Sequence, residues 1–385
     1  MSGKSKPAII FRVTPPARLA RVVERLRHSL LLLHQRTLPA PMAMMEMIVG
    51  GWSAQAVTAA AELGIADALA DGPLSLEELA ARVGADADAL RRLLRALIGR
   101  GVFRRRRDGR YALNSLAAAL RSDAPISLAG AALFQGSQEQ RERWSLLADA
   151  VRQGKSVVPA LRGKEGWEYL AEKPELAALF NATITSLARM TMAPVVACYD
   201  FGAYRTIVDV GGGQGTMLAA ILARASGSRG VLYDLPRVVA TAPDVLRDQD
   251  VADRVRIAEG SFFDEIPPGG DVYILKNIIH DWADDKALQI LRNVRAAAGT
   301  RATVLLIEMV VREHGRDCPE NWVDLEMLLN LGSRERTAEE YRELLSQAGF
   351  QMTRIVPTAS PLSVVEAVSK TEGEAEVDAE AAADG

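Results

Sequence analysis

The sequence predicts an α/β protein whose larger part is a doubly wound, mostly parallel sheet of seven strands, preceded by a mostly helical N-terminal region. Beyond Arg205, short apolar runs rich in β-branched residues alternate with segments of helical length, which is typical of βαβ units. Only "PTASP" separates the last two apolar runs. Because so short a connection cannot form a crossover, the final strand should run antiparallel to its neighbour.

The composition is that of a globular chain long enough for more than one core. Its 385 residues are 49% hydrophobic and 25% charged, with a net charge of −3, which argues against nucleic acid as the main ligand. The two cysteines, Cys198 and Cys318, lie far apart, so we expect neither a disulfide framework nor a metal cluster. No secretion signal and no membrane-length apolar run occurs. We therefore expect a cytoplasmic protein that does not enter the membrane.

The chain is predicted to divide into four segments. Residues 1–120 form a helical, winged-helix-like domain, and residues 121–205 form a helical connecting segment. Residues 206–370 form the α/β domain. The tail at 371–385 is rich in acidic residues and has no aromatic residue, so it should be disordered.

Residues 17–35 should form an amphipathic helix, because leucines and valines recur there at helical spacing with arginines on the other face. Such a helix could lie on a membrane surface. The favoured alternative is a helix that packs on its own protein or on a partner subunit, since amphipathicity is usual for any surface helix.

Three helices and a hairpin follow, in the order of a winged helix-turn-helix. The second helix begins with a capping box made by Ser75 and Glu78, and the hairpin turns at Asp108-Gly109. Arginines on the third helix and at 104–107 raise the hypothesis of DNA binding. The acidic chain makes dimerisation the favoured use of this module and nucleic acid an unlikely partner.

The stretch "VDVGGGQG" lies where a ligand should approach the sheet, at the first strand-to-helix turn. A dinucleotide fingerprint requires a small residue where this chain has Thr216. The spacing that fits is G-x-G-x-G, at Gly211, Gly213 and Gly215. A nucleoside without a pyrophosphate, such as S-adenosylmethionine, is therefore favoured. Asp234 ends the second strand, where a carboxylate can accept both ribose hydroxyls or simply cap a helix.

His280 follows the fourth strand in "ILKNIIHDWADD", at the edge where the ligand should lie. A histidine there could act as a general base near neutral pH. The alternative is a structural histidine paired with Asp281. Two acids could orient the base: Glu308 at the end of the fifth strand and Glu335 in "GSRERT".

Together these residues resemble the plant-type small-molecule O-methyltransferases. The segments "VDVGGGQG", "YDLPRVV", "EGSFFDEIP", "LKNIIHDWADD" and "RERT" occur in the order of that family, and the resemblance spans about residues 45–368. The family includes caffeic acid, isoflavone and acetylserotonin O-methyltransferases and bacterial relatives that act on aromatic polyketides. The resemblance implies the Rossmann-like class I methyltransferase sheet and a homodimer formed through a winged-helix dimerisation domain. It also implies that residues 121–205 contribute to the substrate pocket and that residues 206–370 form the S-adenosylmethionine-binding catalytic domain.

The resemblance also implies the chemistry. S-adenosyl-L-methionine would be the cofactor, S-adenosyl-L-homocysteine the product, and no metal would be required. A hydroxyl of a small aromatic acceptor, such as a phenol, flavonoid, quinone or polyketide, would be deprotonated by His280, with Glu308 and Glu335 beside it. The predicted cofactor-binding residues are Asp209, Gly211, Gly213, Gly215, Asp234, Leu235, Ser261, Phe262 and Lys276. The predicted acceptor-binding residues are Phe180, Ile184, Met192, Trp282, Met327 and Asn330.

The chain departs from the family pattern at Ser261. The family usually has an aspartate there that contacts the adenine amino group; with the shorter, uncharged serine this contact would be either lost or mediated by water. Two other functions remain open from the sequence: a methyltransferase-like hydroxylase or decarboxylase that uses the cofactor structurally, and a DNA-binding regulator that senses a ligand.

Overall fold

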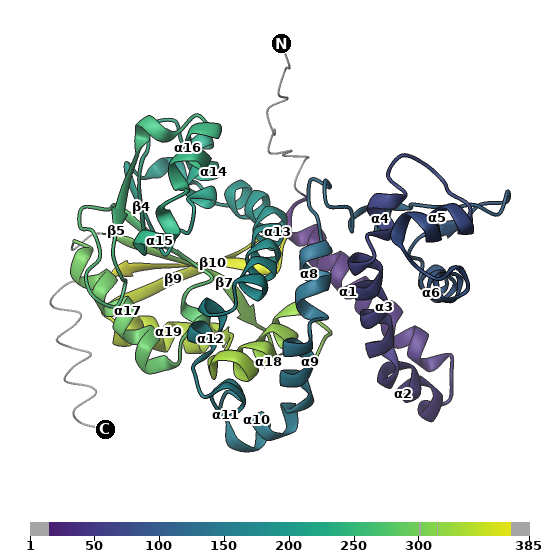
Figure 1. Ribbon diagram of the computed structural model, residues 1–385. Helices are drawn as coiled ribbons and strands as arrows, with labels where there is room; N and C mark the ends of the chain where they lie inside the picture. The colour runs from purple at the N-terminus through teal and green to yellow at the C-terminus, as the bar shows by residue number, and fades with distance from the viewer. Residues whose placement is uncertain (1–14, 300–301, 314, 371–385) are drawn as a thin grey trace, which may run out of the picture. The chain divides into compact units, whose positions relative to one another are not determined.

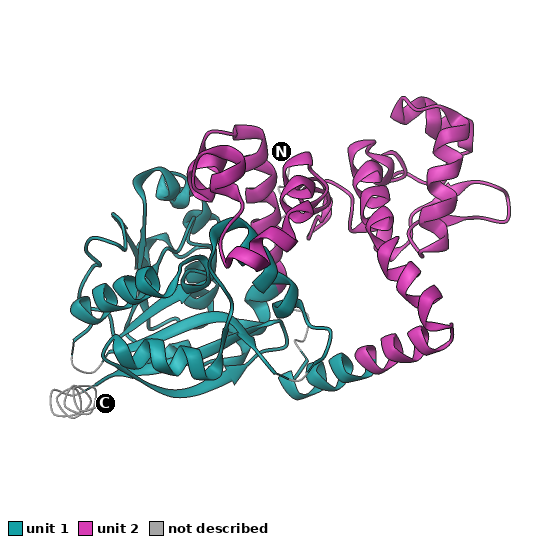
Figure 2. Cartoon of the chain, turned by 90° about the horizontal axis from the view of Figure 1, so that it is seen from below, with its two compact units in different colours: residues 1–26, 191–385 teal, residues 27–190 magenta. Residues whose placement is uncertain are grey.

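The computed structural model describes residues 15–299, 302–313 and 315–370. The predicted disordered tail lies outside these residues. The chain forms two compact units, one of residues 27–190 and the other of residues 1–26 and 191–385 (Figure 2).

The unit of residues 27–190 is helical apart from one short hairpin. Its capping box at Ser75 and Glu78 is confirmed, and the predicted hairpin pairs Arg104 with Ala112 in antiparallel register. Leu79, Leu90 and Leu94 are among the residues of its own apolar core. The elements up to the hairpin are α1 (Ala17–Arg36), α2 (Ala40–Ile48), α3 (Gly50–Glu62), α4 (Ile65–Ala68), α5 (Leu76–Val83), α6 (Ala87–Gly99), β1 (Arg104–Arg105) and β2 (Tyr111–Ala112).

After the hairpin the chain is helical as far as Cys198, as predicted. These helices are α7 (Ser115–Ala118), α8 (Ala129–Gln135), α9 (Gln138–Ser145), α10 (Leu147–Gln153), α11 (Val158–Arg162), α12 (Gly166–Ala171) and α13 (Pro174–Cys198). Within the unit of residues 27–190, Ser186 on α13 donates a hydrogen bond to the carbonyl of Ser127, and Phe180 packs edge-on against Phe134.

The other unit contains the predicted sheet (Figure 1). Its strands are β3 (Thr206–Val210), β4 (Arg229–Asp234), β5 (Val255–Glu259), β6 (Val272–Lys276), β7 (Thr303–Val311), β8 (Arg336–Thr337), β9 (Phe350–Pro357) and β10 (Leu362–Ser369). The order along the sheet is β5-β4-β3-β6-β7-β10-β9. Strand β10 is antiparallel to both of its neighbours, which confirms the predicted reversal of the last strand. The short β8, which was not predicted, pairs in parallel with the end of β7.

Helices cover both faces of the sheet because successive strand residues point to opposite sides. Ile207 of β3 belongs to a core with α14 (Thr216–Arg224) and α16 (Ala242–Asp248), whereas its neighbour Val208 belongs to a core with α17 (Asp284–Ala297) and α19 (Ala338–Gln347). The remaining elements of this unit are α15 (Pro236–Val239), α18 (Pro319–Leu331) and the 3₁₀ turns η1 (Phe201–Ala203), η2 (Ala252–Arg254) and η3 (Ile279–Asp281).

The predicted amphipathic helix at 17–35 is confirmed as α1. Its apolar residues remain roughly half exposed in the single chain, as Leu26 and Leu33 show. Glu24 forms ion pairs with Arg312 and Arg316. In the part of the chain that the structure describes, no helix has the length and apolar character needed to cross a membrane.

Candidate active site

The candidate site lies at the carboxyl edge of the sheet, where the parallel strands β3, β4, β5 and β6 all end. The glycine loop follows β3 directly. Gly211 has a left-handed φ of 69°, and a Cβ there would lie 2.6 Å from Cδ1 of Ile278. Gly213 is also left-handed, but a Cβ there would meet nothing within 4 Å. The loop therefore packs tightly against the protein on one side and leaves open space on the other, which fits a bound ligand.

Asp234 joins the end of β4 to this loop. Its Oδ2 accepts a hydrogen bond from the backbone N–H of Gly213 at 2.9 Å, and its Oδ1 accepts one from Leu235 at 2.7 Å. Each carboxylate oxygen has a second lone pair, so the residue can shape the loop and still accept a hydroxyl. Burial raises the pKa of Asp234, while the two backbone hydrogen bonds oppose that rise.

Aromatic side chains border the glycine loop. Phe262 lies within 3.5 Å of the position that a Gly211 Cβ would take. It packs on Phe263 with ring centroids 5.0 Å apart, and Trp282 packs edge-on against Phe263 at 4.7 Å. Ser261 uses its Oγ to accept the N–H of Phe263 at 3.2 Å. The predicted cofactor residues Ser261 and Phe262 therefore lie in one turn beside the predicted acceptor residue Trp282.

Asp209 and Lys276 supply buried charge at the ends of β3 and β6. Asp209 is 1% exposed, and its Oδ2 has no hydrogen-bond partner among the described residues. Burial raises the pKa of Asp209 to about 7, against the opposing influence of Lys276. Burial also lowers the pKa of Lys276, and the carboxylates of Glu308 and Asp209 oppose that shift. A polar cofactor group could satisfy the unpaired oxygen, because buried polar atoms normally find partners.

His280 lies on the 3₁₀ turn η3, with both ring nitrogens facing carboxylates. Its Nδ1 is 2.7 Å from Oε1 of Glu335, and its Nε2 is 3.4 Å from Oδ1 of Asp281. The Glu335 side chain is fully buried, and its backbone N–H donates to Asp324 on α18. The structure thus brings the predicted base together with one of its two predicted orienting acids.

Glu308 is placed differently from Glu335. Its Oε1 accepts the backbone N–H groups of Ile278 and Ile279 at 3.0 and 2.9 Å, and its Oε2 is buried without a partner in the described chain. The hydrogen bonds of Glu308 therefore go to the backbone that leads into His280 rather than to the imidazole. Its charge still acts on the ring through space.

These carboxylates determine the protonation of the site. Burial alone would lower the pKa of His280, but Asp281, Glu308 and Glu335 raise it to about 10. Burial raises the pKa of Glu308 to about 7 and that of Asp281 to about 6, and His280 opposes both shifts. The rise in the pKa of His280 follows from the geometry, because each ring nitrogen faces a carboxylate oxygen.

The same residues are the candidate metal ligands. His280, Glu308 and Glu335 offer ligand atoms that all lie within 4.8 Å of one another. Two of these atoms are already joined in the 2.7 Å contact between Nδ1 and Oε1. A metal would have to break this hydrogen bond, so we assign none, and the absence of a metal requirement stays a prediction.

The predicted acceptor residues are distributed over both units. Met327 and Asn330 lie on α18, which contacts the turn that carries His280. Met192 is 4% exposed and packs in the apolar core beside Val195. Phe180 and Ile184 belong to the other unit, where Phe180 packs edge-on against Trp167.

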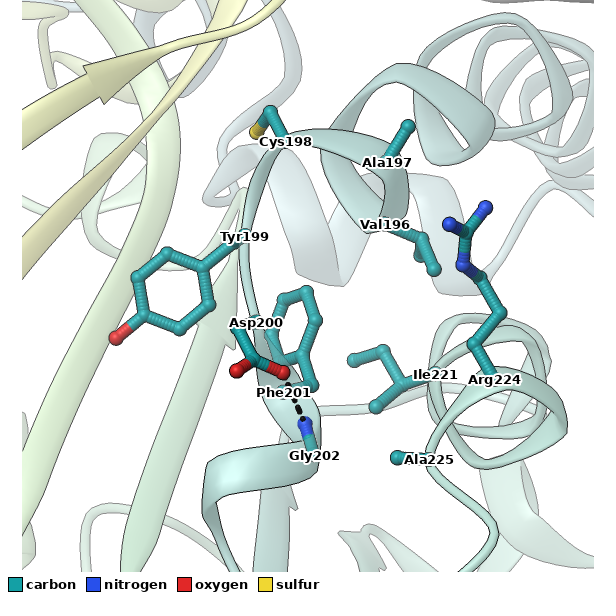
Figure 3. Close-up of a pocket in the computed structure, with 10 residues that line it drawn as sticks. All are labelled: Val196, Ala197, Cys198, Tyr199, Asp200, Phe201, Gly202, Ile221, Arg224 and Ala225. Atoms are coloured by element: carbon teal, nitrogen blue, oxygen red, sulfur yellow. Dashed lines mark hydrogen bonds between the residues drawn. The ribbon is translucent and has the colours of Figure 1, made fainter.

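A cavity of about 420 Å³ lies at the opposite edge of the sheet (Figure 3). It is lined by the end of α13, the turn η1 and the end of α14, including Cys198, Asp200 and Arg224. These segments lead into the amino ends of β3 and β4. Ligands of doubly wound sheets bind beyond the carboxyl ends, and the glycine loop is there. We therefore do not assign the cofactor to this cavity.

Sequence reasoning missed two residues of the site. Asp281 was considered only as a structural partner of His280, although its position beside the base in "HDW" was a usable signal. Arg336 is 1% exposed and hydrogen-bonds the backbone around His280. Nothing in the sequence indicates that this arginine, among many, is buried.

Comparison with known proteins agrees with this fold and identifies the family. Residues 144–351 match the model of the O-methyltransferase domain, and residues 45–123 match that of the O-methyltransferase dimerisation domain. The phenazine O-methyltransferase PhzM of Lysobacter antibioticus is 40% identical over 86% of this chain and 96% of its own. The mitomycin biosynthesis 6-O-methyltransferase of Streptomyces lavendulae is 36% identical over 83% of this chain and 92% of its own.

Solved structures extend this agreement to the cofactor. The O-methyltransferase NcsB1 from neocarzinostatin biosynthesis, in complex with S-adenosylmethionine and 2-hydroxy-5-methyl naphthoic acid, superposes with a TM-score of 0.70 at 34% identity, over 82% of this chain and 95% of its own. Because two family models and relatives along most of its length agree, the chain belongs to the S-adenosylmethionine-dependent O-methyltransferases that carry an N-terminal dimerisation domain.

Proposed function

We propose that this enzyme methylates a hydroxyl of a small aromatic acceptor and that His280 is the general base. The observation that carries the proposal is the buried contact of 2.7 Å between His280 Nδ1 and Glu335 Oε1 at the carboxyl edge of the sheet. Because Nδ1 faces Glu335, the other ring nitrogen, Nε2, points away from Glu335. A hydroxyl that reaches Nε2 in place of Asp281 would meet a base already oriented by a carboxylate.

The cofactor residues fit S-adenosylmethionine. The glycine loop leaves open space at Gly213, Asp234 keeps lone pairs for the ribose, and Asp209 offers an unpaired oxygen to a donor. The cofactor, when bound, supplies an electrophilic methyl group on a sulfonium. The task of the protein is then to orient the acceptor oxygen and to remove its proton.

In the proposed mechanism His280 Nε2 takes the proton of the acceptor hydroxyl, so that the oxygen can accept the methyl group that bound S-adenosylmethionine would supply, with S-adenosylhomocysteine as the product. Glu335 accepts a hydrogen bond from Nδ1–H and stabilises the imidazolium that forms. Glu308 keeps the backbone at Ile278 and Ile279 in place and adds negative charge near the ring. The buried carboxylates balance the positive charge of the proton that remains on the histidine.

Aromatic acceptors are supported by the relatives and by the residues near the base. PhzM is named for phenazine methylation, and NcsB1 was solved with a naphthoic acid. In this chain Trp282, Met327 and Asn330 lie on or beside the elements around His280. Apolar side chains with few polar groups suit a flat aromatic molecule.

We also infer that the protein is a homodimer. The apolar side chains of Met42, Met47, Ile48 and Trp52 are each more than half exposed in the single chain. The match to the dimerisation domain begins at residue 45, within this region. Apolar patches of this kind usually mark interaction surfaces.

The function is tested by replacing His280 with alanine and following transfer of a labelled methyl group to a panel of phenols, flavonoids, quinones and polyketides. Loss of the base should lower kcat by ~10²–10⁴-fold, while S-adenosylhomocysteine still binds. His34→Ala is the control, because the His34 side chain is exposed and forms an ion pair with Glu46 on the surface. Full methyl transfer by His280→Ala would refute the assignment.

A further inference from the structure

We propose that Arg336 is a positioning residue for His280, holding the segment 279–284 so that the imidazole stays against Glu335. The inference rests on the proposed role of His280 as the base. Arg336 lies on the short strand β8, directly after Glu335, and its side chain is 1% exposed. So deeply buried a guanidinium requires several hydrogen-bond partners.

Among the described residues, the hydrogen bonds of the Arg336 side chain go to the segment that carries His280. Its Nη1 donates to the carbonyl of Ile279 at 2.9 Å, and its Nη2 donates to the carbonyl of Trp282 at 2.9 Å. Nη2 and Nε also donate to Oδ1 of Asp284, at 2.7 and 3.1 Å. One side chain therefore bridges the residue before His280, the turn after it and the first residue of α17.

The segment also needs an anchor from outside because its own backbone is irregular. Asn277 has a left-handed φ of 51°, and η3 is only three residues long. Glu308 accepts the N–H groups of Ile278 and Ile279, while Arg336 donates to the carbonyls of Ile279 and Trp282. The backbone on both sides of His280 is thus fixed by side chains from β7 and β8.

The sequence Arg334-Glu335-Arg336 offers a matched comparison. Arg334 also pairs with Asp284, but it is about half exposed, and its guanidinium forms ion pairs with the carboxylates of Asp284 and Glu340. Arg336 is buried and reaches backbone carbonyls. A planar guanidinium can span several acceptors at fixed angles, whereas a lysine ammonium cannot. Arg336→Lys therefore keeps the charge and removes the bridge.

The experiment compares Arg336→Lys with Arg334→Lys in the full chain. Acceptor kinetics are measured with S-adenosylmethionine, and S-adenosylhomocysteine binding is measured by calorimetry. The His280 ring is titrated by NMR, with its signal assigned from the spectrum of His280→Ala. For Arg336→Lys we expect kcat to fall ~10–100-fold, with acceptor KM and cofactor Kd each changed by less than about threefold. The titration of His280 should move towards that of free histidine, near ~6.5. Arg334→Lys should resemble the parent protein.

The inference is overturned if Arg336→Lys leaves the His280 titration unchanged, or if activity falls only in proportion to lost cofactor binding. If Arg336→Lys does not fold, Asp284→Asn tests the same bridge, because Asp284 is a half-exposed partner of Arg336. It should change kcat and the His280 titration in the same direction as Arg336→Lys, but by a smaller amount. A shifted titration with unchanged kcat would support the positioning role and count against His280 as the base. Failure of the two proposals can therefore be told apart.

Discussion

The carboxyl edge of the sheet and the helices at residues 40–62 differ in the side chains that they place at a cost in free energy. At the carboxyl edge of its sheet, the unit that carries His280 buries Asp209, Glu308 and Glu335, each at most 3% exposed. The unit of residues 27–190 exposes Met47 and Trp52, the latter at 75%. Buried carboxylates and exposed apolar side chains both cost free energy. The proposed active site would explain the first cost, and the proposed dimer would explain the second.

The largest expected effect concerns the buried charges. Because the surrounding carboxylates raise the pKa of His280 to about 10, the neutral form that can accept a proton increases as pH rises. For a phenol that is neutral throughout, kcat/KM should grow by ~10-fold per pH unit between about pH 7 and 9. The measurement is a pH profile in buffers of constant ionic strength.

Glu335→Gln is the control for this profile. It keeps the shape of Glu335 and removes one negative charge, so the rising limb should move to lower pH while the maximal rate falls. A parent profile that is already flat above pH 7 would contradict the raised pKa of His280.

The second prediction concerns the exposed apolar surface. Replacing both Met47 and Trp52 with serine should weaken the dimer by at least ~100-fold, because a buried large apolar side chain contributes ~1.5–3 kcal/mol. Sedimentation velocity over a dilution series measures the dissociation constant of the dimer. Val151 is also exposed, at 62%, and lies outside the matched dimerisation region. Val151→Ser should leave assembly unchanged, and a double variant that stays dimeric at all dilutions would exclude this surface as the interface.

The third prediction returns to the polar edge of the sheet. Asp234→Ala removes the acceptor of the Gly213 and Leu235 N–H groups together with the proposed ribose contact. Since a hydrogen bond to a charged group contributes ~1.5–3 kcal/mol, the Kd for S-adenosylhomocysteine should rise by ~10–100-fold. Glu259→Ala, at the exposed end of the next strand, should bind it like the parent. Equal affinities for all three proteins would leave Asp234 only a capping role.

The smallest expected effect is at Ser261. Aspartate there can still accept the Phe263 N–H that Ser261 Oγ accepts now, and it would restore the family's contact to the adenine amino group. We expect Ser261→Asp to tighten S-adenosylhomocysteine binding by a few-fold, ~0.5–1.5 kcal/mol for one hydrogen bond. Calorimetry measures it, with Ser261→Asn as the uncharged control. Weaker binding in Ser261→Asp would show that this pocket has adapted to serine.

Much of the sheet could be predicted because its signals are local. The apolar runs, the short link before β10 and the glycine run after β3 each depend on neighbouring residues, and all are found where they were expected. The strand β8 was missed, because two residues carry no periodicity. The pairing of β8 with Val310 and Val311 depends on residues far away in the sequence.

The site was predicted in part for the same reason. His280, Asp234 and the glycine loop follow strand ends, so a parallel sheet brings them to one edge. The hydrogen-bond partner of each polar group could not be predicted from the sequence. The hydrogen bonds of Glu308 go to backbone N–H groups at residues 278 and 279, and Arg336 is among the most buried side chains. Neither fact follows from residue type.

By itself the sequence determined the order of strands and helices, the side of the sheet on which a nucleoside would bind, and the presence of a histidine beside it. These follow from periodicity, spacing and the shared direction of parallel strands. Only the tertiary structure decided which carboxylate meets the imidazole, which one holds its backbone, and that a buried arginine bridges the turn around it. Such contacts join β7, β8 and η3, and burial and hydrogen-bond partners are properties of the packed chain.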